Sequence, residues 1–595
     1  MPAAERAIKP RDEVLSLNVL AEKAVDAPEN RSQFRVLMRH FLDRFFGSEL
    51  ASPSADGDAK TLLVQAACAI GLPPWVLSLY LYTPYHMPFH VLRSYWQQAG
   101  DHYFFVLYTM VAMGIVTIFE WDLLFPDLLD VFVLASLPVR AGRLLRARIT
   151  AILLLIAAAI FASSFLPPLV LPAATDPPHL FRFLAAHCSA VACGGLFSAT
   201  LLLGLEGLLL AVLGDRWFRR VSLWLQGFAV VVLLSSLFLY PVVFGVLPRL
   251  ILSGSGRVFW FPPFWFLGIY QRVLGGSSTP PIFAALARFG WLGTLATVVL
   301  ASAVYPLAWW RRTAGLVEGA ATREHQRRIA IPVHSALHTT LARAPGARAV
   351  WHFIGQNLLR VPRNRMVLVL YGGAGVALLL AAALRIALEH GRMRIAVSPD
   401  GLRAMVPIAA FWTVSGLRST FLAPADQRGR WIFRVVLGKP AWPHVQASRR
   451  WALLWTTLLT LALAALACVA VPLHSWHFAA VQGFVAVALS LLLTDAFFLN
   501  LRTIPFTGSQ STSATNPALL LIPYLGFFPA IVLFTVAAEP WLGASAGHLV
   551  VAAAVAAAAH IAMLRVHKAR IAENLLQIEA DDDQEDFPLR LGLRY

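Results

Sequence analysis

The sequence predicts an all-α polytopic membrane protein. The chain has 595 residues, of which 58% are hydrophobic and only 14% are charged, and its mean hydropathy is +0.65. Soluble domains carry about 45–50% apolar and about 25% charged residues. The apolar residues gather in runs of about 20, the length that an α-helix needs to cross the hydrocarbon core of a bilayer. These observations exclude a soluble globular enzyme, a disordered scaffold and a collagen-like fibre.

Twelve apolar runs are counted as spans, in two sets of six. The first set is 61–82, 102–119, 150–172, 183–213, 221–248 and 286–310. The second set is 365–388, 402–418, 450–472, 477–500, 517–538 and 542–564. The weakest two are the first, which Pro73 and Pro74 interrupt, and 402–418, which is short. We therefore expect about twelve transmembrane helices.

The net charge of +17 is explained by membrane topology better than by nucleic-acid binding. With the N-terminus placed inside, the expected internal loops hold most of the loop arginines, above all the central segment 311–364. The positive-inside rule then places both termini in the cytoplasm. Residues 1–60 are polar, so we expect no signal peptide. The excess of arginine over lysine and the many alanines indicate a GC-rich bacterial genome. Composition and topology together therefore predict a bacterial inner membrane.

The two sets of spans share a layout, with an offset of about 300 residues, which predicts two pseudo-repeated six-helix halves around a central pathway. An amphipathic segment precedes each half and is expected to lie in the interface plane. The expected parts are a cytoplasmic N-terminal segment 1–60, a first transmembrane half 61–310, a basic cytoplasmic linker 311–364, a second transmembrane half 365–564 and an acidic cytoplasmic tail 565–595.

The stretch 119–151 joins the second and third spans and reads as a short helix, a sharp break and a basic helix that enters the membrane. Proline suits the first turn of the second helix because its missing N–H is not needed there. Such an arrangement is a lever, since a push on the short helix would tilt two spans. The residues that we assign to this coupling role are Asp122, Asp127, Asp130, Leu137, Pro138, Arg140 and Arg143.

This stretch resembles the cytoplasmic coupling region of ATP-binding-cassette type-2 (ABC-2-like) export permeases. In that family an acidic segment leads to a small-Leu-Pro-Val/Leu-Ser/Arg turn and then to a Leu-Leu-x-Ala-Lys/Arg helix start. The matching residues are Asp127, Ala135, Ser136, Leu137, Pro138, Val139, Arg140, Leu144, Leu145, Ala147 and Arg148. The resemblance implies a permease subunit with two six-span sets fused, driven by a separate ABC ATPase that binds ATP and Mg²⁺. The second internal stretch, 418–450, departs from the pattern, with Gly438-Lys439-Pro440 in place of the turn.

The sequence holds no G-x-x-x-x-G-K-[ST] phosphate-binding loop. We therefore expect no enzymatic activity, catalytic residue or cofactor in this chain. The four cysteines lie in apolar stretches without C-x-x-C spacing, which predicts no disulfide. Pro84 and Pro88 disrupt the helical spacing of His86 and His90, so we expect no metal site.

A second reading is a proton-coupled secondary transporter of the major facilitator type. Twelve spans suit that superfamily, and Asp426-Gln427-Arg428-Gly429-Arg430 resembles its Asp-Arg-x-Gly-Arg loop. In the export-permease reading, Asp426, Arg428 and Arg430 instead belong to the second coupling stretch. A membrane protein without a transport role is the third reading. The sequence does not identify the substrate, since a hydrophobic pathway suits lipids, drugs and peptides alike.

Two acidic residues fall inside spans, Glu206 in the fourth and Asp495 in the tenth. An acid in hydrocarbon costs several kcal/mol unless it is paired or neutral, so it is a functional candidate. The functional reading is a proton relay or a polar point on the substrate path, and the structural reading is a hydrogen bond between helices.

An aromatic segment lies between the fifth and sixth spans, where the resembled family often has short re-entrant helices on the outer side. Aromatic residues at this density suit a membrane interface. The residues that we assign to an outer gate or interface are Trp260, Phe261, Phe264 and Trp265.

Overall fold

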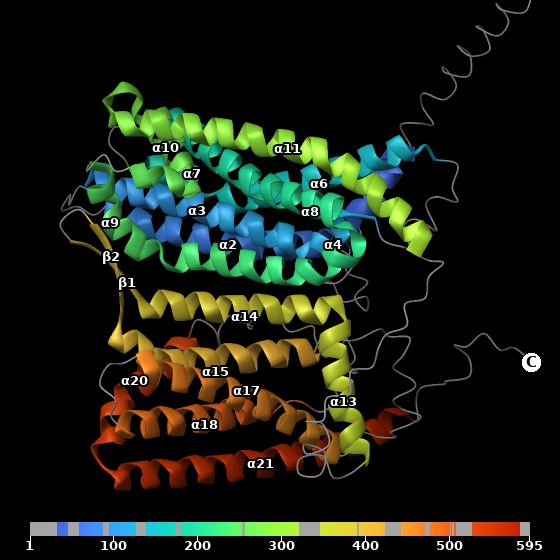
Figure 1. Ribbon diagram of the computed structural model, residues 1–595, viewed down its shortest axis with the longest axis vertical. Coiled ribbons are helices and arrows are strands. Elements are labelled where there is room, and N and C mark those ends of the chain that lie inside the picture. The colour runs from blue at the N-terminus through green and yellow to red at the C-terminus, as the bar shows by residue number, and fades with distance from the viewer. Residues whose placement is uncertain are drawn as a thin grey trace, which may run out of the picture. The chain divides into compact units, whose positions relative to one another are not determined.

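The structure, a computed structural model, consists almost entirely of packed helices (Figure 1). It describes residues 33–43, 45, 59–86, 94–126, 139–173, 180–252, 256–319, 345–389, 392–422, 442–470, 476–499, 501, 505–506 and 526–582. The chain divides into two compact units. Unit 1 comprises Met1–Ala51, Ala55–Phe218 and Pro262–Arg323, and unit 2 comprises Ser52–Ser54, Arg219–Phe261 and Glu324–Tyr595.

Unit 1 is built from long apolar helices that pack through small and aromatic side chains. Its elements are α2 (Ala59–His86), α3 (Tyr95–Phe119), α4 (Trp121–Leu124), α6 (Ala141–Ser164), α7 (Pro167–Ala173), the first part of α8 (Leu180–Phe238), α10 (Pro262–Gly275), η2 (Gly276–Ser278) and α11 (Pro281–Gly319). A helical segment over residues 33–43 precedes them. One core cluster joins α3, α8, α10 and α11 around Phe266 and Tyr270, both 0% exposed.

Unit 2 contains the end of α8 and the elements that follow the central segment. These elements are α9 (Tyr240–Leu252), η1 (Gly256–Trp260), α13 (Pro345–Arg360), α14 (Pro362–Ala383), β1 (Leu384–Glu389), β2 (Arg392–Val397), α15 (Pro399–Leu422), α17 (Trp442–Ala470), α18 (Trp476–Phe498), α20 (Phe528–Ala544) and α21 (Ala546–Asp582). A core cluster in this unit joins α13, α15, α17 and α18 around Phe411 and Ile354.

Nine helices in the described part of the chain are long and apolar enough to cross a membrane. They are Tyr95–Phe119, Gly142–Ser164, Leu180–Gly214, Val221–Phe238, Pro281–Ala314, Asn364–Ala383, Trp442–Val469, His477–Phe498 and Ala546–Ala572. Nine of the twelve predicted runs overlap them, although the bounds differ: the runs 150–172 and 221–248 continue into the separate helices α7 and α9. The runs 61–82 and 517–538 overlap shorter apolar helices, Ala67–Tyr82 and Phe528–Ala544, and 402–418 lies within α15, which is not among the nine. The chain is a multi-pass α-helical membrane protein.

A β-hairpin replaces the end of the seventh predicted span. The run 365–388 was expected to be helical throughout, but α14 ends at Ala383 and strand β1 begins at Leu384. Strands β1 and β2 pair antiparallel, with Leu384 opposite Val397. Both strand sequences alternate apolar residues with period two, which favours a strand over a helix.

Helix α8 contains the break between the fourth and fifth predicted spans. Regular helical geometry fails at Gly214, which has φ 70° and ψ 167°. A positive φ is accessible to glycine without the penalty that a Cβ imposes. The chain therefore changes direction at Gly214 without leaving helical structure for more than one residue.

Helices α10 and α11 approach each other closely at Gly268. A Cβ at this position would lie 2.6 Å from the Cβ of Leu286 and 2.7 Å from the backbone nitrogen of Ala287. Only a residue without a side chain allows this contact. The glycine thus allows the aromatic segment of α10 that follows Pro262 to pack directly against α11, the sixth predicted span.

Candidate functional site

A buried arginine anchors the backbone segment that leads into the first predicted coupling stretch. Arg148, in the second turn of α6, is 1% exposed. Its guanidinium donates hydrogen bonds to the carbonyl oxygens of Leu123 and Phe125, the latter at 2.8 Å. It also stacks over two rings, with its central carbon 5.1 Å from the centre of Phe41 and 5.3 Å from the centre of Trp309. One side chain therefore joins the 33–43 segment, the end of α4, α6 and α11.

The neighbouring carbonyls of the same segment are held from α11. The Tyr305 hydroxyl donates to the carbonyl oxygen of Leu124 at 2.6 Å, and Arg312 Nε donates to that of Pro126 at 3.5 Å. Four consecutive carbonyls, 123–126, thus accept hydrogen bonds from α6 and α11. We call Arg148, Tyr305, Arg312 and these carbonyls the Arg148 cluster. Because Arg148 and Arg312 are charged donors, these hydrogen bonds are stronger than neutral ones and tie the segment to both helices.

Glu206 lies beside the Arg148 cluster. It is 1% exposed on α8, and the Tyr305 hydroxyl interacts electrostatically with both Glu206 and Arg148. The next residue, Gly207, faces Val304 of α11, with 3.0 Å between its ideal Cβ position and Val304 Cγ1. A buried acid near a buried arginine offsets part of the cost of removing either charge from water.

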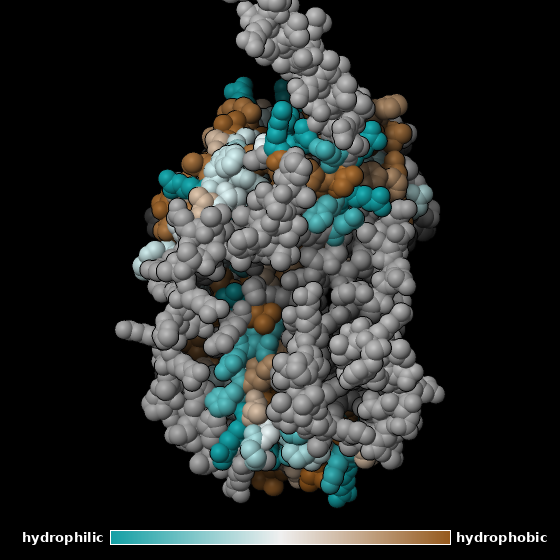
Figure 2. Space-filling model, turned by 90° about the vertical axis from the view of Figure 1, so that its right-hand side faces the viewer, coloured by the Kyte–Doolittle hydropathy of each residue, from teal (hydrophilic) through white to brown (hydrophobic). Residues whose placement is uncertain are grey.

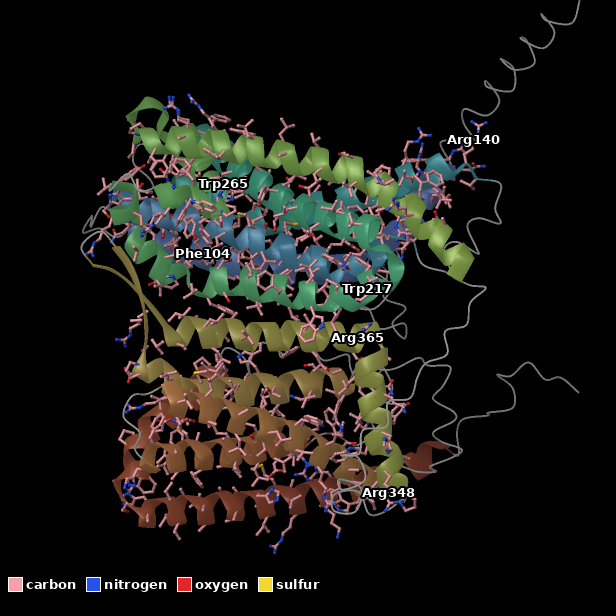
Figure 3. The ribbon with its side chains drawn as sticks, viewed as in Figure 1. Phe104, Arg140, Trp217, Trp265, Arg348 and Arg365 are labelled. Carbon is pink, nitrogen blue, oxygen red and sulfur yellow. The ribbon has the colours of Figure 1, made fainter. Side chains whose placement is uncertain are left out.

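The predicted coupling residues fall partly within the described structure. Arg140 occupies the N-cap position of α6 without a side-chain capping hydrogen bond and is exposed, and Arg143 donates to Gln33 Oε1 at 2.5 Å. The backbone of Asp122 lies in α4. In unit 1, Arg140 lies at one end of the helices and Trp265 toward the other (Figure 3). Asp127, Asp130, Leu137, Pro138, Asp426, Arg428 and Arg430 lie outside the described residues.

Asp495 forms a buried charged cluster in unit 2. Its side chain is 2% exposed on α18 and forms an ion pair with Arg449 of α17. Its other carboxylate oxygen lies 2.5 Å from Nδ1 of His560 on α21. We call Arg449, Asp495 and His560 the Asp495 cluster. The structure brings one predicted pathway residue together with two basic side chains that sequence reasoning did not assign.

A second charged cluster surrounds Glu539 on α20. Its side chain is 4% exposed, accepts a hydrogen bond from Gln482 Nε2 at 2.9 Å and lies 3.6 Å from Arg403 Nε. Arg403 is 41% exposed and also lies 3.7 Å from the carboxylate of Asp400. We call Asp400, Arg403, Gln482 and Glu539 the Glu539 cluster. Gln482 is near the start of α18 and Asp495 near its end, so the two clusters of unit 2 lie at opposite ends of that helix.

The predicted outer aromatic residues differ in environment. Phe264 is buried at 4% exposure, and Trp265 packs edge-on against Phe197, with ring centres 5.9 Å apart. Trp260, in contrast, is 88% exposed, and Phe261 is half-buried. Phe264 and Trp265 therefore belong to the packing of unit 1, whereas Trp260 presents its ring to the surroundings.

No metal centre is present within the described residues. They contain no group of three or more His, Cys, Asp or Glu side chains placed to hold an ion. His102 instead stacks on Tyr270, with ring centres 4.1 Å apart, and its Nδ1 lies 3.0 Å from Nε2 of Gln271. The four cysteines are free thiols.

Comparisons with protein-family models, with curated proteins and with solved structures return no match.

Sequence reasoning missed several site residues, among them Arg449, His560, Arg403 and Glu539. One signal was available for Glu539, an acid embedded in the apolar sequence 528–544. The predicted span ended at 538, one residue before it. For unit 2, Figure 2 looks onto the end of the helices at which Arg348 lies and shows hydrophilic side chains among the described residues there.

Proposed function

We propose that this chain is the membrane-spanning permease of an export system driven by a separate ATP-binding-cassette ATPase. The observation that carries the proposal is the Arg148 cluster, in which four consecutive carbonyls accept hydrogen bonds from two helices. A partner that pushes the segment following Pro126 would move α6 and α11 together. ATP binding and hydrolysis belong to the partner, and this chain supplies the pathway.

The resemblance to ABC-2-like permeases supports the same role for the segment. Arg148 is the basic residue of the Leu-Leu-x-Ala-Lys/Arg helix start, and Arg143 contacts the 33–43 segment through Gln33. In this proposal the chain has twelve spans, with both termini in the cytoplasm of a bacterial cell. The 33–43 segment is the amphipathic helix that precedes the first span.

The proposed internal repeat is supported by corresponding polar positions. Each half has a buried arginine near the start of its third span, Arg148 and Arg449, and a buried acid in its fourth span, Glu206 and Asp495. In the second half, His560 of the sixth span contacts Asp495. In the first half, Tyr305 of the sixth span lies beside Glu206. Two halves that share this arrangement suit alternating access by a rocking motion.

The test is co-purification from the native membrane in mild detergent, followed by mass spectrometry. We expect an ATPase to accompany the wild-type chain and to be lost from the double variant Asp127→Arg with Pro138→Ala. The matched control, Asp400→Arg, places the same charge change in the Glu539 cluster and is expected to retain the partner. Absence of an ATPase from the wild-type sample would contradict the proposal.

Proton-coupled secondary transport is the second candidate function. The observation in its favour is the Asp495 cluster, in which a buried carboxylate contacts a histidine at 2.5 Å. Carboxylate–histidine chains within membrane bundles serve as proton relays in pumps and transporters. Substrate flux that depends on a proton gradient, and that Asp495→Asn abolishes without any ATPase present, would establish this candidate in place of the first.

A further inference from the structure

A run of buried residues follows one face of α18 between the two charged clusters of unit 2. Gln482, Ala486, Ser490 and Thr494 succeed one another at intervals of four, so they share one helical face. Each of these side chains is at most 1% exposed. Three of the four are polar, and the run ends beside Asp495. Helix α18 therefore carries a polar face along most of its length, with one apolar interruption.

Helix α17 lines the same interface with hydroxyl groups. Thr456 and Thr460 are both 0% exposed, and Thr460 Oγ1 lies 3.0 Å from Ser490 Oγ. Arg449, two turns before Thr456 on the same helix, pairs with Asp495. Polar side chains from both helices thus continue from the Asp495 cluster as far as Ser490.

Several of these buried polar atoms have no hydrogen-bond partner among the described residues. They are Thr456 Oγ1, Thr494 Oγ1, Gln482 Oε1 and the Nε and Nη1 atoms of Arg449. Hydroxyls that serve helix packing bond to a carbonyl of the preceding turn, as Thr460 does to Thr456 at 2.9 Å. Buried polar atoms are otherwise satisfied by ordered water. Packing between the helices does not account for the unpartnered atoms, whereas a hydrated path does.

The polar run is interrupted by a hydrophobic layer at Ala486. This residue belongs to a buried cluster with Val406, Ala464, Val481, Val485 and Leu542. Ala486 lies one turn from Gln482 and one turn from Ser490. An apolar layer can close a hydrated pathway without a moving plug, because water leaves a narrow apolar segment.

We propose that unit 2 contains a proton path between the Glu539 and Asp495 clusters and that the layer around Ala486 closes it. A proton binds the Glu539 carboxylate from the side on which Arg403 is exposed. It passes along the hydroxyls and water to Asp495 and leaves through His560. At each transfer one O–H or N–H bond forms as another breaks, and no electron is exchanged. The inference goes beyond the proposed ATP-driven function and requires only that unit 2 spans a bilayer.

The test measures proton flux into liposomes that hold the purified full-length chain and a trapped pH-sensitive dye, with potassium and valinomycin to balance charge. Ala486→Ser places a hydroxyl in the apolar layer around Ala486. We expect the proton flux to rise at least about tenfold over wild type, because the hydroxyl should lower the barrier to the rate-limiting proton transfer. The matched control is Ala480→Ser, at an exposed position of the same helix, and should leave the flux unchanged.

Two further variants test the ends of the path. Ala486→Ser combined with Asp495→Asn, and Ala486→Ser combined with Glu539→Gln, should each return the flux to the wild-type value. If Ala486→Ser does not fold as a monodisperse protein, Val485→Thr places a hydroxyl in the same layer with little change in volume. A folded variant of either kind with unchanged flux would overturn the proposal, as would a raised flux that persists after either carboxylate has been removed. None of these outcomes depends on whether an ATPase co-purifies.

Discussion

Arg449 and Asp495 form an ion pair between α17 and α18 in which the two side chains are only 7% and 2% exposed. The attraction between the two charges offsets the free-energy cost of removing each of them from water. The pair lies 46 positions apart in the sequence, and His560 joins it from a third helix. It therefore fixes the mutual register of three helices as well as placing a titratable group inside the bundle.

The first prediction is that removal of either member of the ion pair destabilises unit 2, whereas removal of both members together has a much smaller effect. Arg449→Met leaves Asp495 as a buried charge without its principal partner, and the stability should fall by about 3–5 kcal/mol. Asp495→Leu leaves Arg449 as a buried charge without this partner and should lower the stability by a similar amount. The double variant should recover most of the loss, because replacement of a buried pair by apolar side chains is often close to neutral. Thermal unfolding in detergent of the wild type and three variants gives the complete cycle, and additive losses would contradict the prediction.

The second prediction concerns the Arg148 cluster. Arg148→Met removes two charge-assisted hydrogen bonds to the 123–126 segment and two contacts with aromatic rings, and the expected loss of stability is about 2–4 kcal/mol. Arg146→Met is the matched control on the same helix, because Arg146 is exposed and, among the described residues, donates only to the carbonyl of Gly142. Its effect should stay within about 0.5 kcal/mol.

The same two variants separate coupling from stability. In a complex with the proposed ATPase, Arg148→Met should lower substrate-stimulated ATP hydrolysis at a temperature well below its unfolding midpoint, whereas Arg146→Met should retain it. Equal stimulation in both variants would mean that the 123–126 segment does not transmit movement.

The membrane class and most helix positions could be predicted from the sequence because both follow from local apolar density. Asp495 and Glu206 could be selected because an acid within an apolar run stands out in a single sequence. Their partners could not, since Arg449 and His560 reach Asp495 only through packing of three helices. Pairing of this kind depends on helix rotation and register, which one sequence without aligned relatives does not reveal.

The errors of detail also have local physical causes. The apolar content of Leu384–Glu389 extended the seventh predicted span, although its alternation with period two is that of a strand. The break at Gly214 divides two runs that were predicted separately, but a single glycine with positive φ replaces the expected loop. The predicted span 517–538 ended one residue before Glu539, so the carboxylate was not considered.

The third prediction tests the contact between α10 and α11. Gly268→Ala would place a Cβ 2.6 Å from Leu286 Cβ, so the helices must separate, at an expected cost of about 1–3 kcal/mol. Gly245→Ala in α9 is the matched control, since among the described residues no atom beyond its chain neighbours and its own helix backbone lies within 4 Å of its ideal Cβ position. That change should stabilise the chain by about 0.5–1 kcal/mol, because alanine loses less conformational freedom in a helix. The two unfolding midpoints should therefore move in opposite directions, and a shift of the same sign would refute the packing argument.

The last prediction concerns orientation in the membrane. Within unit 2, α13 lies at one end of α14 and the β1–β2 hairpin at the other (Figure 1). The basic segment that contains α13 should face the cytoplasm, because arginines are retained on that side during insertion. Single cysteines at exposed positions, Ala349→Cys in α13 and Ala396→Cys in β2, test this in a chain from which Cys68, Cys188, Cys193 and Cys468 have been replaced by alanine.

A membrane-impermeant maleimide added to intact cells should label Ala396→Cys at once and Ala349→Cys only after permeabilisation. The reverse pattern would invert the proposed topology and place the coupling segments outside the cell, where no ATP is available to a partner. Labelling of both cysteines from the same side would mean that α14 does not cross the bilayer. The count of spans would then be odd, and the two halves of the chain could not share one orientation.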